Sequence, residues 1–232
     1  MSYTVGEFSI KFPDKKASSS FSSGYGCKKP RAQIEISLEE GYEREIWIPV
    51  RVARAFIKEK PSTPIGLEEF RGRVDALERT CALTMVTEML SRRDHASGEV
   101  RDKLAVYGFH PSAIDYAVQR AIDLHFLDDR RFCSYFIEER KRRGWGRRKI
   151  ELELKRRHIV IEEIPGYPEA YFHEEDDAER ARALLAKRRV ADTRPFEKLV
   201  RYLMGKGFSY GIAADAAKQR IAREREDSEL LP

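Results

Sequence analysis

Apolar residues recur along the second half of the chain in a pattern typical of short amphipathic helices. In three windows, an apolar residue is followed four positions later by a leucine, and then by a stop residue and another apolar residue. The leucines lie 50 and 49 residues apart. An i, i+4 apolar pair that ends at glycine is typical of a helix with its C-terminal stop. The windows are Val100-x-x-x-Leu104-x-x-x-Gly108-Phe109, Ile150-x-x-x-Leu154-x-x-x-His158-Ile159 and Leu199-x-x-x-Leu203-x-x-x-Gly207-Phe208.

The flanks of each window predict two further helices, so each unit contains three. A helical stretch ending in cations precedes each window, and an isoleucine (Ile114, Ile164 or Ile212) follows each stop. We predict three tandem repeats at residues 79–125, 126–175 and 176–225, with a tail at 226–232. Units of this period bury their apolar faces against their neighbours and form an elongated, curved array. Chance similarity among helices is the alternative, and the two nearly equal spacings disfavour it.

The second unit departs from the pattern. His158 stands where the other units have glycine, and Pro165, Gly166 and Pro168 follow Ile164 closely. Proline removes a backbone donor and breaks a helix. The last helix of this unit is therefore expected to be short, displaced or begun late.

The first 30 residues are predicted to form a flexible segment. Lys15 to Pro30 is rich in Ser, Gly and Lys, which is a composition typical of disorder. A small module at residues 31–78 follows it. The predicted fold class is mainly α, with three tandem three-helix repeats preceded by this β-hairpin and helix module.

Alternation of apolar and polar side chains predicts the hairpin. Residues 33–38 and 44–49 alternate around Glu39-Glu40-Gly41. Trp47 is expected in the core of the hairpin, or between the hairpin and the next helix. Helical stretches are predicted at Val50 to Lys58 and Leu67 to Leu77. No function follows for this module.

Charge is distributed unevenly along the chain. Charged residues make up 36% of the sequence, yet the net charge is only +5. Between Arg140 and Arg157 there are ten Lys or Arg and two acids, whereas residues 162–179 hold eight acids and no Lys or Arg. Each cation that meets a phosphate releases condensed counterions, so the basic run suits a polyanion.

Basic clusters recur at corresponding places in the three units: Arg92-Arg93, Arg140 to Arg143 and Lys187 to Arg189. Stacked repeats would align them in one row on a concave cationic surface. The alternative is a set of ordinary solvated helix faces. The density of cations, the scarcity of interleaved acids and the recurrence favour a binding surface.

The residues that catalysis or cofactor binding needs are not arranged in any familiar motif. The five histidines have no metal-ligand spacing, and glycine-rich phosphate loops are absent. Asp128 and Asp129 could be paired acid/base carboxylates or metal ligands, but aspartate ahead of an apolar-periodic segment is typical of a helix N-cap. We therefore predict no enzyme activity, no metal and no cofactor.

Trp145, between Gly144 and Gly146, has two interpretations. The ring could stack on an exposed base or press on a partner protein. It could instead fold back over the junction between two helices, and this structural interpretation is slightly favoured.

Three widely spaced cysteines and the lack of an apolar N-terminal signal region favour free thiols in a reducing cytoplasm. No apolar run is long enough to span a bilayer.

The motifs resemble those of the RecX family, whose members regulate the RecA recombinase. The resemblance extends from about Cys81 to Ile221. The similar elements are Leu127-Asp128-Asp129 with Arg131-Phe132, Gly144-x-Gly146 with Ile150 and Leu154, Leu90-Ser91-Arg92-Arg93 with Ser97-x-Glu99 and Lys103-Leu104, and Gly207-Phe208-Ser209. The Gly-x-Gly turn is structural in that family.

The resemblance implies a monomeric cytoplasmic regulator in DNA repair, homologous recombination and the SOS response. It implies a crescent of repeats in the groove of the RecA–single-stranded-DNA filament, where it limits filament growth, ATP hydrolysis and strand exchange. Inhibition is the expected direction, and double-stranded DNA is a further candidate partner. The alternative is a helical nucleic-acid-binding module, a transcription or RNA-binding factor that acts without RecA.

We predict that the basic residues of the second unit contact the filament or DNA and that the other two clusters add outer contacts. The predicted contacts are Arg140, Lys141, Arg142, Arg143, Trp145, Arg147, Arg148, Lys155, Arg156 and Arg157, with Arg92, Arg93, Lys187, Arg188 and Arg189 as the outer set.

Overall fold

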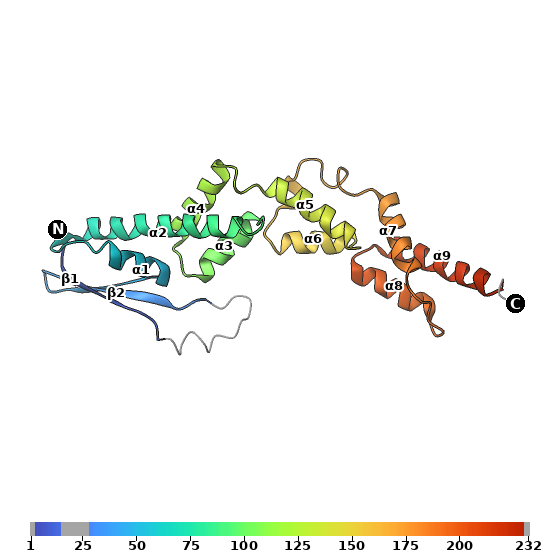
Figure 1. The fold of residues 1–232 in the computed structure, drawn as a ribbon, viewed down its shortest axis with the longest axis horizontal. Coiled ribbons are helices and arrows are strands. Elements are labelled where there is room, and N and C mark those ends of the chain that lie inside the picture. The colour runs from blue at the N-terminus through green and yellow to red at the C-terminus, as the bar shows by residue number, and fades with distance from the viewer. Residues whose placement is uncertain (1–2, 15–27, 230–232) are drawn as a thin grey trace. The chain divides into compact units, whose positions relative to one another are not determined.

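The computed structural model describes residues 3–14 and 28–229, and the chain divides into two compact units, Met1–Asp128 and Asp129–Pro232 (Figure 1). The described residues are mostly helical, with a small antiparallel sheet near the N-terminus. The predicted fold class is therefore confirmed. That the repeats form an elongated, curved array stays a prediction.

The first unit begins with a four-stranded antiparallel sheet of order β3-β2-β1-β4. Its strands are β1 (Thr4–Lys11), β2 (Arg31–Leu38), β3 (Glu43–Pro49) and β4 (Ile65–Gly66). The hairpin of β2 and β3 is confirmed, and Gly41 adopts a φ of 82° in its turn.

β1 corrects the prediction that the first 30 residues are flexible. Its apolar alternation is weak in sequence because a register irregularity falls between Val5 and Glu7. A bulge of this kind breaks the period of two on which strand prediction depends. Of the Ser/Gly/Lys-rich stretch, residues 15–27 lie outside the described residues.

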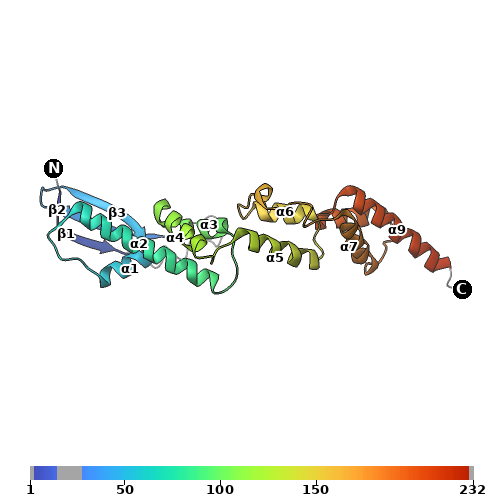
Figure 2. The same cartoon turned by 90° about the horizontal axis from the view of Figure 1, so that it is seen from above.

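Helices α1 (Val50–Lys58) and α2 (Leu67–Leu90) lie on one face of the sheet (Figures 1 and 2). Phe8, Phe56 and Phe70 meet there with ring centroids 5.0–5.7 Å apart. The predicted boundary between residues 78 and 79 falls inside α2. No proline interrupts this helix, and its buried residues join the sheet and the first repeat in one core, so these two predicted segments form a single unit.

Trp47 also corrects a prediction, because 49% of it is exposed. Side chains alternate across a strand. Ile46 and Ile48 take the inner face of β3, so Trp47 points to the opposite face of the sheet.

Two of the three predicted repeats have three helices each. The first contains the end of α2, α3 (Ser97–Val106) and α4 (Pro111–Asp123), and the third contains α7 (Glu174–Ala186), α8 (Pro195–Lys206) and α9 (Tyr210–Glu229). The second has α5 (Asp129–Arg142) and α6 (Arg147–Lys155), followed by the 3₁₀ turn η1 (Ile161–Glu163). The expected shortening of its last helix is confirmed.

The same C-terminal stop ends α3, α6 and α8. The backbone N–H of Phe109, Ile159 and Phe208 donates to the carbonyl of Leu104, Leu154 and Leu203 over 3.2, 3.2 and 3.1 Å. Gly108, His158 and Gly207 precede them in the left-handed region, with φ of 83°, 57° and 96°. This 6→1 hydrogen bond and left-handed residue form a Schellman motif. His158 is thus the structural equivalent of the two glycines, as its place in the repeat predicted.

The start of α3 depends on one carboxylate. Glu99 accepts from the backbone N–H of Ala96 at 3.3 Å, and Arg93 Nη1 and His95 Nδ1 lie 3.3 and 3.4 Å from its Oε2. Burial of Glu99 opposes its ionisation, but the contacts with His95, Arg93 and Ala96 outweigh burial and lower the pKa of Glu99 to about 2.

A carboxylate with a lowered pKa stabilises the folded state above its unfolded pKa and loses that contribution as the pH falls through its folded pKa. Glu99→Gln should therefore lower the free energy of unfolding near pH 7, by no more than about 3 kcal/mol. The difference from the unchanged chain should shrink between about pH 5 and pH 2. Urea unfolding over that pH range measures it. Glu68→Gln, at a site 90% exposed on α2, should stay within about 0.5 kcal/mol throughout. A Glu99→Gln difference that does not vary with pH would contradict the assignment.

Candidate nucleic-acid interface

The basic region, residues 140–157, covers the end of α5, the turn after it and α6 with its stop. The structure sorts its cations into three kinds. Arg142, Arg148 and Lys155 are exposed and have no ion pair within 4 Å among the described residues. We call these three the free cations. They are available to a polyanion without loss of an internal contact.

Two of the predicted cations instead pack inward. The side chains of Arg140 and Lys141 are only 18% and 13% exposed. The Arg140 guanidinium lies over the rings of Phe136 and Trp145, 4.6 and 5.0 Å from their centroids. Lys141 Nζ contacts Glu138 at 2.9 Å and lies 5.1 Å from the Phe172 ring centroid. Cation–π contacts of this kind stabilise the fold, so these two cations hold the unit together.

The remaining arginines of the basic region form ion pairs with nearby glutamates. The sequence suggested too few acids to pair with the cations, and the structure corrects this, because Glu139, Glu151 and Glu153 lie one helical turn from their partners. The pairs are Arg143–Glu139, Arg147–Glu151 at 2.7 Å, Arg156–Glu153 at 2.8 Å and Arg157–Glu153 at 2.8 Å. Hydrogen bonds from Arg157 and Arg156 lower the pKa of Glu153 despite its burial. Exposed pairs are weak, so Arg143 and Arg156 can still exchange partners.

The segment after η1 packs against α6, and its aromatic rings contact the Arg147 guanidinium. The Tyr167 hydroxyl donates to Glu151 at 2.5 Å, and burial raises the pKa of Tyr167. The Arg147 guanidinium lies 5.8 and 5.7 Å from the ring centroids of Tyr167 and Phe172. Aromatic residues of the acidic stretch 162–179 thus cover part of the basic region. A Tyr–Phe cluster beside prolines is the only sequence signal for this.

Trp145 and its two glycines lie at the junction of the second and third repeats. The indole lies between Arg140 and Lys149, whose Nζ is 4.2 Å from its centroid. Gly146 N–H donates to the Lys206 carbonyl at 2.9 Å, and Arg148 N–H donates to the Gly207 carbonyl at 3.1 Å. A Cβ on Gly146 would lie 2.5 Å from the Gly207 carbonyl carbon. This geometry agrees with the structural interpretation of the turn.

The outer clusters are exposed but belong to different parts of the chain. Arg92 and Arg93 lie in the first unit, so the predicted single row of cations stays a prediction. Lys187, Arg188 and Arg189 follow α7 in the second unit, and the Arg188 guanidinium stacks 4.0 Å from the Tyr202 ring centroid.

α5 begins at Asp129, so Asp128 stands at the N-cap position and Asp129 lies in the first turn of the helix, in agreement with the N-cap interpretation. Within residues 3–14 and 28–229, no three His, Cys, Asp or Glu side chains gather where they could hold a metal ion. Over the same residues, no helix is long and apolar enough to cross a membrane.

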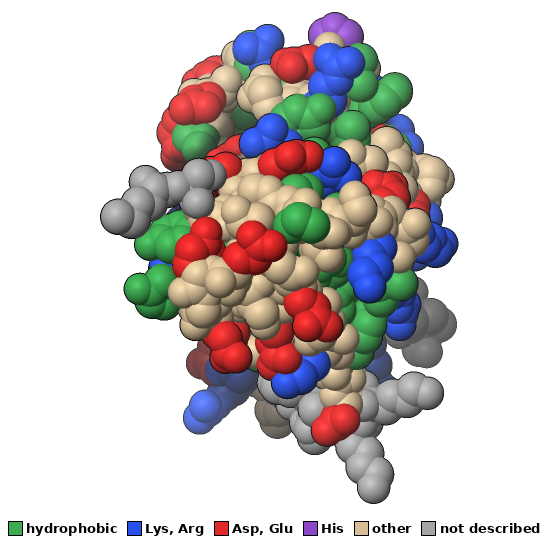
Figure 3. Space-filling view, turned by 90° about the vertical axis from the view of Figure 1, so that its left-hand side faces the viewer, with side chains coloured by type: hydrophobic (Ala, Val, Ile, Leu, Met, Phe, Trp, Pro, Cys, Tyr) green, Lys and Arg blue, Asp and Glu red, His purple; other side chains and the backbone are tan. Residues whose placement is uncertain are grey.

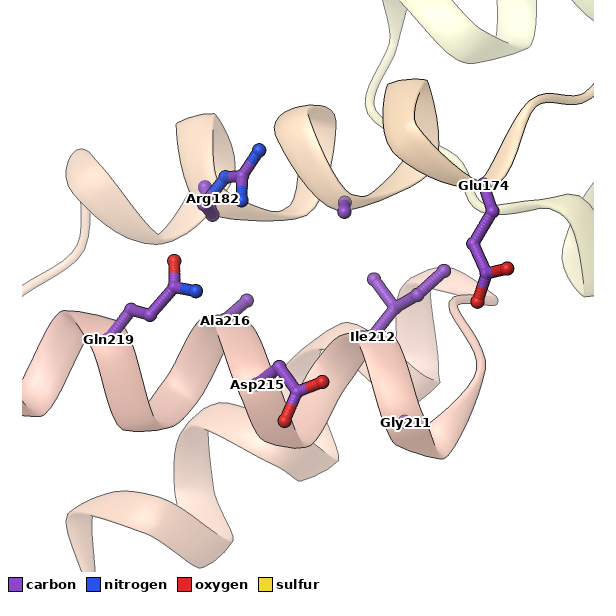
Figure 4. Close-up of a pocket in the computed structure, with 8 residues that line it drawn as sticks. Glu174, Arg182, Gly211, Ile212, Asp215, Ala216 and Gln219 are labelled. Atoms are coloured by element: carbon purple, nitrogen blue, oxygen red, sulfur yellow. The ribbon is translucent and has the colours of Figure 1, made fainter.

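A small hollow lies between α7 and α9 (Figure 4). Ala178 of α7 lines it on one side and Ile212 and Ala216 of α9 on the other. Arg182 and Gln219 lie toward one end, and Glu174 lies toward the other. Its charges are mixed, so it offers a polyanion no preferred site. Nothing in the sequence pattern pointed to it.

Two sequence models of RecX domains match the chain. The first three-helix domain of RecX matches residues 82–120, and the second matches residues 128–164. A regulatory protein RecX of Thermus thermophilus is 33% identical over 146 residues, which cover 62% of this chain and 93% of that protein. One of Vibrio campbellii is 31% identical over 148 residues, covering 60% of this chain and 89% of that protein. The chain belongs to the RecX family.

The fold agrees with two crystal structures of RecX proteins. RecX from Lactobacillus salivarius has a TM-score of 0.54 at 20% identity, over 63% of this chain and 99% of that chain. A second regulatory protein RecX has a TM-score of 0.54 at 16% identity, over 91% of this chain and 97% of that chain. Identities this low establish a shared fold and nothing about individual contacts.

The close approach at Gly146 gives a stability prediction. Gly146→Ala places a methyl group against the Gly207 backbone, which cannot rotate away as a side chain would. We expect a loss of about 1–3 kcal/mol in the unfolding free energy of the second unit, measured by urea denaturation. Gly205→Ala, on the exposed side of α8 with open space at its Cβ, is the matched control and should gain about 0.5–1 kcal/mol. Equal effects of the two substitutions would show that the turns do not meet.

Proposed function

We propose that this RecX-family chain regulates RecA by binding the RecA–single-stranded-DNA filament and limiting its growth, ATP hydrolysis and strand exchange. It acts by binding and not by catalysis. Family membership supports the assignment, because the matched relatives are regulatory proteins named RecX.

The single observation that carries the proposed contact is the set of free cations on α5 and α6. Arg142, Arg148 and Lys155 project from neighbouring elements of one unit, and no acid of the described residues neutralises them. A nucleoprotein filament presents a repeating line of phosphates and acidic groups. Cations with no internal partner bind such a surface at the lowest cost, since no ion pair has to be broken first.

The inward cations support the surface without contacting the partner. Arg140 and Lys141 fix the orientation of Trp145 and Phe172, and Arg147 fixes Tyr167. A rigid frame lowers the entropic cost of association, because the free cations sit on helices that are already ordered. The contact set proposed from sequence therefore narrows to the free cations, with the exchangeable Arg143 and Arg156 beside them.

Titration of RecA distinguishes a filament regulator from a protein that merely binds DNA. We expect this chain to inhibit the single-stranded-DNA-dependent ATP hydrolysis of RecA at well below one copy per RecA, because blocking one filament end stops many subunits. The measurement is the rate of ATP hydrolysis against the ratio of the two proteins. Inhibition only near saturation of the DNA would indicate competition for the strand. No effect on RecA, together with tight binding to bare nucleic acid, would favour the RecA-independent module.

Charge reversal tests the proposed contact. Arg142→Glu, Arg148→Glu and Lys155→Glu combined should raise the concentration for half-inhibition by on the order of 10-fold or more, because each replaces an attraction by a repulsion. Far-UV circular dichroism and thermal unfolding should stay close to those of the unchanged chain.

The matched control reverses three exposed cations of α1 and α2, namely Arg54→Glu, Lys58→Glu and Arg71→Glu. It changes the net charge by the same amount in the first unit. Equal loss of inhibition in both variants would mean that only the total charge matters. Inhibition that survives reversal of the free cations would remove the basic region from the contact.

A further inference from the structure

The exposed tryptophan of the sheet lies in a row that crosses three strands. Lys11 of β1 is paired with Gln33 of β2, and Gln33 is paired with Trp47 of β3. All three are on the outer face, because the alternate residues Ile10, Ile34 and Ile48 face the helices. The Trp47 ring adds nothing to the core of the unit and lies on a polar face.

Charge changes sign along this outer face. On one side of the Trp47 row, Glu35 lies opposite Glu45, and Ser37 lies opposite Glu43. Figure 3 views the molecule from the left-hand end of Figure 1 and shows acidic side chains over that end, interspersed with basic and hydrophobic ones. On the other side lie Arg31 and, just before β2, Lys28 and Lys29. These three cations are all exposed.

Arg31 is held in place from both sides. Its guanidinium carbon lies 6.0 Å from the Trp47 ring centroid. Its aliphatic part lies against the stop of α3, where a Cβ on Gly108 would be 2.7 Å from Arg31 Cδ. The backbone N–H of Lys29 donates to the Val106 carbonyl at 2.7 Å, which fixes the segment ahead of β2 on the same helix end. The first repeat thus orders the cationic side of the aromatic row.

We propose that this face binds single-stranded nucleic acid, with one base stacked on Trp47 and the adjacent phosphates on Arg31, Lys29 and Lys28. An exposed ring beside ordered cations is the arrangement that binds an unpaired base together with its backbone. Glu35 is paired with Lys11, whereas the exposed Glu43 and Glu45 repel phosphate and so confine the backbone to the Arg31 side of the ring. A duplex does not offer a free base face, and the acidic side disfavours its second strand.

This surface goes beyond the proposed function, because it lies in the first unit and involves none of the free cations. Single-strand binding at this face and regulation of RecA can therefore be tested separately.

Fluorescence of Trp47 itself is the first test. Trp145→Phe leaves Trp47 as the one tryptophan of the chain. Titration with an oligothymidine should quench its emission, since a stacked base quenches indole. Arg31→Glu in this background should weaken the quenching. Charge reversal of Arg142, Arg148 and Lys155 in the same background should leave the quenching unchanged. Emission that does not change at saturating oligothymidine overturns the proposal. Emission that changes with RecA but not with bare oligothymidine overturns it too, and would assign the face to protein.

Affinity is the second test, in the chain whose free cations are reversed so that the basic region does not dominate. Trp47→Ala in that background should weaken oligothymidine binding by about 5- to 100-fold, the range expected for loss of one stacked base. Tyr42→Ala is the matched control, since Tyr42 is 58% exposed in the β2–β3 turn on the acidic side, and it should change affinity less than about 2-fold. Similar losses for Trp47→Ala and Tyr42→Ala, or binding as tight to duplex as to single strands, would overturn the proposal.

Discussion

The left-handed stop at the end of α3, α6 and α8 is the constraint on which the rest of the structure depends. It reverses the chain within two residues and returns an apolar side chain to the helix just completed, so each repeat closes its own core. Two of these stops also receive another segment. The aliphatic part of Arg31 packs against Gly108, and the backbone of Gly146 packs against Gly207. Glycine at these positions thus allows both the turn and the close approach.

Local pairing then decides which cations of the basic region can bind a partner. Glutamates one helical turn away form ion pairs with Arg143, Arg147, Arg156 and Arg157. Aromatic rings contact the Arg140 guanidinium. A dense run of arginines therefore overstates the available positive charge. The proposed interface depends on the few cations left over, while the others make contacts within their own unit.

The sequence predicted the repeated features well, because each rests on interactions within a few residues. The apolar–leucine–stop order identified α3, α6 and α8, and even His158 was placed in the role of glycine. What it missed depends on distant segments. β1 loses its alternation at an irregularity in its pairing with β2, and Arg147 is covered by Tyr167 from the following turn. Trp47 is a different case, because its alternation with Ile46 and Ile48 is local and which face of β3 is covered depends on the distant helices. Contacts across 16 or more residues leave little trace in local periodicity.

The two candidate surfaces rely on different physics. The free cations attract phosphate or acidic protein groups whatever the base. Their affinity therefore falls as the salt concentration rises, because the release of counterions then gains less entropy. Stacking on Trp47 needs an unpaired base face and is far less sensitive to salt. A chain that carries both can be drawn to a filament by charge and yet be sensitive to whether the strand within reach is single. The acids beside Trp47 strengthen that distinction, since they penalise any second strand that would bring phosphate to their side of the sheet.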